Sequence, residues 1–95
     1  MTQNESDPKI ATDIVWRLLD DNAVVVSPRA GEVRVLNAVG TAIWQRLVDE
    51  EGLTEIEEYL QNSYDVKQER VHSDLLSFLE ELTDRGILVW NDTIP

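Results

Sequence analysis

Three short apolar runs, separated by turn signals, occupy the first third of this 95-residue chain. They cover residues 14–19, 23–27 and 32–36, and their valine and isoleucine content favours β-strands. The segments between them, Asp20-Asp21-Asn22 and Pro28-Arg29-Ala30-Gly31, are turn clusters too short for anything but antiparallel connections. The sequence therefore predicts a three-stranded antiparallel meander.

The second and third runs differ in pattern. Residues 23–27 are apolar almost throughout, which predicts a strand buried on both faces. The third run alternates, with Val33 and Val35 on one face and Glu32, Arg34 and Leu36 on the other. A sheet of three strands has two open edges, and an unpaired edge is a liability unless it is used. We expect the edge of residues 32–36 to accept a further strand.

Helical periodicity begins where the third strand ends. Asn37 is a suitable cap for a helix over residues 38–50, which Gly52 would close. Thr54-Glu55-Ile56-Glu57 predicts a capping box that starts a second helix ending near residues 62–63. The longest helix is expected over residues 67–85, with Gly86 as its stop. Its apolar face consists of Val71, Leu75, Phe78, Leu79 and Leu82, with Leu76 at the margin. Residues 87–90 suit either a short final strand or an extended tail. The predicted fold class is α+β.

The chain is long enough for one domain. Residues 1–12 are expected to be a flexible tail, 13–90 the folded domain and 91–95 a C-terminal tail. The sequence contains no cysteine and no apolar segment of membrane-spanning length. Because small secreted domains are often stapled by disulfides, we expect a cytoplasmic protein.

A formal net charge of −11 argues against nucleic-acid binding, which needs clustered lysine and arginine. The acidity serves either solubility or the electrostatic steering of a basic partner.

The residues of catalysis are also missing. His72 is the only histidine, and Glu69 and Asp74 beside it do not make a ligand set. Paired carboxylates fall at turns or on polar helix sides, where they cannot face each other across a cleft. We therefore expect a binding protein that is not an enzyme and that has neither a metal nor a cofactor.

An ordered set of residues resembles the signature of the PqqD-like family. The stretch from Gly31 to Trp44 fits the spacing Gly-x4-Leu-Asn-x2-Gly-x2-Ile-Trp. The match continues through residues 52–56 and 64–66 and closes with Val71, Asp74, Leu75, Phe78, Leu79, Leu82 and Gly86-Ile87-Leu88. It covers roughly residues 14–90.

This family is known as the recognition element for precursors of ribosomally synthesised, post-translationally modified peptides. The resemblance implies a winged helix-turn-helix-like fold, with a three-stranded antiparallel sheet followed by three helices. It also implies that the leader segment of a precursor peptide adds as a strand beside the third strand, against the third helix. The bound precursor would then be presented to a modifying enzyme, such as a radical SAM enzyme or a leader peptidase.

Transferred to this sequence, the implied peptide-binding residues come from one strand and one helix. They are Glu32, Val33, Arg34, Val35 and Leu36 of the strand, and Val71, His72, Leu75, Leu76 and Leu79 of the helix. Many family members carry an aromatic residue where this strand has Val33 and Val35, so the leader side chains that the groove accepts stay open.

Other interpretations are a winged-helix DNA-binding regulator, which the charge opposes, and a small enzyme. The free strand edge could also pair two copies into a homodimer. We expect a proline at Arg34 to weaken peptide binding if the N–H of that residue faces the edge.

Overall fold

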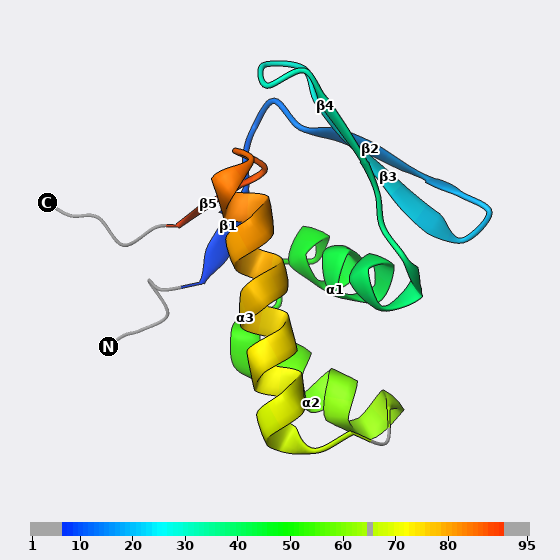
Figure 1. Ribbon diagram of the computed structural model, residues 1–95, viewed down its shortest axis with the longest axis vertical. Helices are drawn as coiled ribbons and strands as arrows, with labels where there is room; N and C mark the ends of the chain where they lie inside the picture. Colours follow the sequence, from blue (N-terminus) through cyan, green and yellow to red (C-terminus); the bar gives the residue numbers. More distant parts are fainter. Residues whose placement is uncertain (1–6, 65, 91–95) are drawn as a thin grey trace, which may run out of the picture.

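The computed structural model describes residues 7–64 and 66–90 and has an α+β architecture. In chain order, the elements are β1 (Pro8–Ile10), β2 (Val15–Leu19), β3 (Asn22–Ser27), β4 (Glu32–Val35), α1 (Ala38–Val48), α2 (Leu53–Ser63), α3 (Gln68–Asp84) and β5 (Leu88–Trp90). Strands β2, β3 and β4 form an antiparallel sheet in that order, beside the three helices (Figure 1). The predicted three-stranded sheet followed by three helices is confirmed. Within the described ranges, every helix is too short or too polar to traverse a bilayer.

The β2–β3 hairpin turns through two residues. Leu19 pairs with Asn22 across the turn, and Asp20 and Asp21 between them have φ values of 52° and 71°. Positive φ at both central positions is the type I′ geometry, whose twist matches that of the flanking strands. Aspartate tolerates this backbone region better than β-branched residues do. The turn between β3 and β4 ends at Gly31, with φ of 67°.

One face of the sheet is buried and the other is open. On β3, Ala23, Val25 and Ser27 are at most 3% exposed, whereas Val24 and Val26 are partly exposed. The prediction that this strand is buried on both faces is therefore wrong. The helices cover the sheet from one side only, and the β2–β3 hairpin projects away from them (Figure 1).

A second, two-stranded sheet brings together the two ends of the described chain. Strand β1 pairs antiparallel with β5, with Pro8 opposite Trp90. Residues 88–90 therefore adopt the strand, which was one of two open alternatives. Residues 8–10 are a strand as well, although they fall in the segment expected to be a tail; residues 1–6 and 91–95 lie outside the described residues. A strand of three residues has no periodicity that would reveal it, and its partner is at the other end of the chain.

The helix starts depend on local capping. The Asn37 side chain accepts a hydrogen bond of 2.8 Å from the N–H of Gly40, as its position before α1 suggests. Helix α2 begins at Leu53 and not at Thr54, because the Glu55 carboxylate accepts a hydrogen bond from the N–H of Gly52. The predicted capping box is therefore wrong by two positions. Asp7 adds a bond from outside the helix by accepting the N–H of Leu53.

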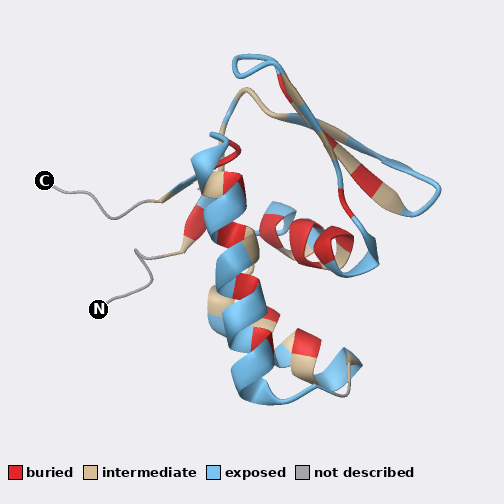
Figure 2. Cartoon of the chain, in the orientation of Figure 1, coloured by how far each residue is buried: buried red, intermediate tan, exposed pale blue. Residues whose placement is uncertain are grey.

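The hydrophobic core lies where the three helices meet the inner face of the sheet. Trp44 of α1, Ile56 of α2, and Leu75, Leu79 and Leu82 of α3 are at most 1% exposed. Figure 2 shows the buried positions as stripes along the facing sides of the helices, while most of β2 and β4 is exposed. The core thus fixes α1 and α3 relative to one another and leaves β4 at the margin.

Candidate functional site

Strand β4 is an edge strand whose free side can be assigned residue by residue. Among the described strands, it has a neighbour on one side only, β3. Leu36 donates its N–H to the carbonyl of Ala23 over 2.8 Å, and inward- and outward-facing backbone groups alternate along an antiparallel strand. The backbone groups of Arg34 therefore face β3, while those of Val33 and Val35 face the open edge.

Because the N–H of Arg34 faces β3 and not the open edge, a proline at Arg34 is not the test of peptide binding that the sequence suggested. That residue lies opposite Val25, and its N–H is directed into the sheet. A proline there would disrupt the pairing of β4 with β3, so a loss of peptide binding would report damage to the sheet and not the loss of a hydrogen bond to the peptide. Val35, whose N–H points outward, is the informative position.

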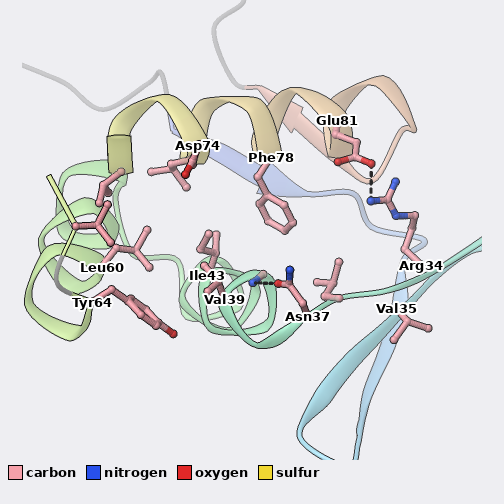
Figure 3. A pocket seen from close by; sticks show the side chains of 15 residues that line it. Arg34, Val35, Asn37, Val39, Ile43, Leu60, Tyr64, Asp74, Phe78 and Glu81 are labelled. Atoms are coloured by element: carbon pink, nitrogen blue, oxygen red, sulfur yellow. Dashed lines mark hydrogen bonds and ion pairs between the residues drawn. The ribbon is translucent and has the colours of Figure 1, made fainter. Parts of the chain in front are cut away.

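A groove of about 530 Å³ begins at β4 and continues between α1 and α3 towards the end of α2. It is lined by Arg34, Val35, Leu36 and Asn37 from β4 and the turn after it; by Val39, Gly40 and Ile43 from α1; by Leu60, Tyr64 and Val66; and by Val71, Asp74, Leu75, Phe78 and Glu81 from α3. In Figure 3, Phe78 points from α3 towards α1, with Arg34 and Val35 at one end of the groove and Leu60 and Tyr64 at the other. The lining is mainly apolar, which is typical of sites that accept side chains.

Gly40 allows the two helices that form the groove to approach closely. A Cβ atom at this position would lie 3.3 Å from Cε1 of Phe78 and 3.2 Å from Oδ1 of Asn37. Both contacts are tighter than ordinary van der Waals separation. A side chain at Gly40 would therefore press on either the cap of α1 or the wall of the groove.

Two ion pairs connect β4 to α3 where the groove meets the sheet. Arg34 pairs with Glu81 at 2.5 Å, and Glu32 accepts a hydrogen bond of 2.7 Å from Arg85. The carboxylate of Glu32 raises the pKa of the Arg85 guanidinium. A second cavity of about 370 Å³ is lined by Ala30, Glu32, Glu81, Asp84 and Arg85. Glu81 thus borders both cavities, and the guanidiniums of Arg34 and Arg85, where the groove meets the sheet, are each paired with a carboxylate.

The structure brings together only part of the residue set implied by the family. Arg34, Val35, Leu36, Val71 and Leu75 line the groove. Glu32 lines the second cavity, and Val33 is 63% exposed on the outer face of the sheet. His72, Leu76 and Leu79 lie elsewhere on α3: His72 pairs with Glu57 of α2, Leu76 is exposed, and Leu79 is fully buried in the core.

Sequence reasoning missed the lining residues from α1 and from the end of α2. Val39 and Ile43 were not among the residues implied to bind the peptide, yet both line the groove, and Val39 is 41% exposed. A signal for α1 was present, because its cap follows directly on Leu36 and its first turn must therefore lie at the end of β4. On α3, the groove follows residues 71, 74, 75, 78 and 81, a stripe at i, i+3, i+4 spacing.

The open edge of β4 and the apolar groove beside it are features of a site that binds an extended peptide. In the described ranges, no three of the histidine, aspartate and glutamate side chains are grouped so that they could hold a metal ion. What the site offers is a row of backbone donors and acceptors on β4 next to an apolar groove.

Comparisons with known proteins show a family and a shared fold. The family model described as coenzyme PQQ synthesis protein D (PqqD) matches residues 22–88. A solved structure of TbiB1 in complex with the TbiA(beta) leader peptide is 29% identical, with a TM-score of 0.82 over 92% of this chain and 99% of that one. A lasso peptide synthetase B1 complexed with its leader peptide shares the fold at 23% identity, with a TM-score of 0.81 over 88% of this chain and 99% of that one. No curated protein sequence matches significantly.

Proposed function

The chain belongs to the PqqD family, and we propose that it captures the leader segment of a ribosomally synthesised precursor peptide as an added strand along β4. The observation that carries the proposal is the outward-facing backbone of Val33 and Val35, next to the groove between α1 and α3. The similar TbiB1 structure, which contains a leader peptide, supports it.

Strand addition separates affinity from specificity. Backbone groups of the guest pair with those of β4 whatever the guest sequence is, and each such hydrogen bond contributes about 0.5–1.5 kcal/mol net. Every second guest side chain then points towards the groove, where Phe78, Ile43 and Leu75 offer apolar contacts. Because a flexible leader loses entropy on ordering, a few buried anchors must supply most of the binding energy.

We propose that the protein presents the leader to a separate modifying enzyme and performs no chemistry itself. The described residues include no group suited to hold a metal, and the exposed His72 is engaged with Glu57. We place this role in the cytoplasm, as expected for a domain without cysteines.

The charge favours a leader that carries lysine or arginine. The net charge is −11, so the preference rests on the acidity of the chain as a whole; Asp74 and Glu81 line the groove, but each already pairs with an arginine, Arg70 or Arg34. Opposite charges raise the association rate and specificity more than they raise affinity. Stopped-flow measurements of the association rate at increasing salt check this, because the rate should fall as the charges are screened; a rate independent of salt would contradict it.

The DNA-binding alternative gains no observation in its favour. Arg34, Arg46 and Arg85 are each bound to a carboxylate, so they are not available to phosphates. A gel shift at low salt should show no complex.

Val35→Pro provides the direct test of the added strand. The substitution removes an outward-facing N–H without removing a bond to β3, and proline is tolerated at sheet edges. We expect the affinity for a fluorescent leader peptide that binds the original protein, measured by fluorescence polarisation, to fall about tenfold, equivalent to ~1.4 kcal/mol.

Leu18→Pro is the matched control. The same alternation directs its N–H to the open edge of β2, on the far side of the sheet from the groove. It should leave the affinity within about twofold of the original, provided that circular dichroism shows a folded protein. Equal losses in the two variants, or none with Val35→Pro, would move the peptide away from β4.

A further inference from the structure

The outer face of the three-stranded sheet is almost entirely apolar. Directly paired residues share a face, so Val15, Val26 and Val33 form one row across the sheet, and Arg17, Val24 and Val35 form the next. Leu19 continues the face towards the hairpin turn. Val15, Leu19, Val33 and Val35 are between 55% and 68% exposed.

The fold does not use this face. The buried core lies on the opposite side of the sheet, with Ala23 and Val25, and no outer-face residue except Val35 lines the groove. Apolar patches of roughly 300–600 Å² are the largest that monomers usually expose, and they are often functional. An exposed face of valines and a leucine, on a chain of net charge −11, is characteristic of an interaction surface.

Arg17 is the charged exception within this face, and Asn22, which pairs with Leu19, is its other polar residue. Arg17 is exposed, and it lies beside Val24 near the centre of the apolar rows. Arg29, Arg34, Arg46, Arg70 and Arg85 each pair with a carboxylate of this chain, whereas Arg17 has no ion pair among the described residues. An arginine surrounded by apolar side chains is the composition of an interface hot spot.

We propose that this outer sheet face docks the enzyme that acts on the bound leader, through an apolar surface that presents a carboxylate to Arg17. The inference rests on the proposed function, because the partner is defined as the protein that receives the peptide. Burying the apolar rows would supply the driving force, and the Arg17 pair would fix the orientation.

Continuity with the peptide edge supports this choice of partner. Val33 and Val35 contribute their side chains to the outer face and their backbone groups to the open edge. A leader paired with β4 would therefore extend the same face by its own outward side chains. The loaded protein should consequently bind the enzyme more tightly than the empty one.

A second copy of this chain fits the face less well. Pairing two faces would bring two acidic molecules of charge −11 together and would place each Arg17 against an apolar surface or another arginine. The partner expected from the chemistry is thus a different protein, with an acidic group inside an apolar patch.

The experiment compares Arg17→Glu and Val15→Lys with the original protein. Neither residue lines the groove or contributes to β4. The probe is the purified enzyme that modifies or cleaves the precursor whose leader this protein binds. Its binding is measured by surface plasmon resonance in the presence and absence of saturating leader peptide. The affinity of both variants for the enzyme should fall at least about tenfold, as for the loss of a hot spot. Their affinity for the leader peptide should not change.

Arg29→Glu is the charge-matched control, since Arg29 is exposed in the β3–β4 turn and lies outside the outer face. It should keep the original affinity for the enzyme. The proposal is overturned if the face variants bind the enzyme normally, if the original protein does not bind it even when loaded, or if sedimentation shows a dimer that Arg17→Glu dissociates. Failure of the original protein to bind any leader would instead overturn the proposed function.

Discussion

Phe78 shows how much of the site depends on a single side chain. It is partly buried, extends from α3 towards α1, and packs where Gly40 leaves no room for a Cβ atom. From the sequence, Phe78 was simply one member of the apolar face of the third helix. In the structure, Phe78 lines the groove together with Leu75.

We expect Phe78→Ala to weaken leader binding by about tenfold, because it removes an aromatic anchor from the groove. Stability should fall by less than the ~3–5 kcal/mol typical of fully buried phenylalanines, since the ring is only partly buried. Fluorescence polarisation and urea denaturation measure the two effects. Leu76→Ala is the control: Leu76 lies on the same helix, is 39% exposed and does not line the groove. If both variants bind the leader equally well, the groove is not the binding site.

The strands and helices lie close to the positions predicted from the sequence, but the faces that they turn to the core and to the groove were predicted less well. Helix α3 was expected over residues 67–85 and spans Gln68–Asp84. Its apolar side is wide enough to face both the core and the groove, so periodicity alone could not separate the two. Of the α3 residues implied to bind the peptide, Val71 and Leu75 line the groove, whereas His72 and Leu76 do not; Asp74 and Glu81, which were not in that set, line it as well.

The cap of α1 connects the strand edge to the groove, and its loss should be measurable. Asn37→Ala removes the acceptor for the N–H of Gly40 and should lower the free energy of unfolding by about 0.5–2 kcal/mol in urea denaturation. Asn37→Asp keeps an acceptor oxygen at the helix N-terminus and should restore most of the loss. Equal destabilisation by alanine and aspartate would mean that the side chain acts through packing and not as a cap.

At the scale of the whole molecule, the two ends of the described chain meet against the helices. Strands β1 and β5 pair, Asp7 accepts the N–H of Leu53 at the start of α2, and Trp90 donates a hydrogen bond to Thr83 of α3. The N-terminal segment therefore belongs to the folded unit from about residue 7 onward.

Deletion of residues 1–10 should consequently destabilise the domain. It removes the pairing with β5, the Asp7 contact and the apolar side chain of Ile10, which packs on the core. We expect a loss of about 1–3 kcal/mol, because several contacts of ordinary size are lost together. The melting temperature measured by circular dichroism checks this against a deletion of residues 1–6 only. A melting temperature that is equally low, or unchanged, in both deletions would contradict a stabilising role of β1.

Local sequence patterns indicate the strands of the central sheet, the three helices and the turns, because these depend on residues within a few positions of one another. The acidic charge follows from the composition of the whole chain. The resemblance carried by the spacing from Gly31 to Gly86 determined the family, which the match to residues 22–88 confirms. The tertiary structure alone decided which backbone groups of β4 are free, which flank of α3 lines the groove, and that β1 pairs with β5. It also decided that one face of β3 is open, leaving Arg17 among valines. Each of these depends on how distant segments pack, and packing orients faces that a one-dimensional pattern leaves equivalent.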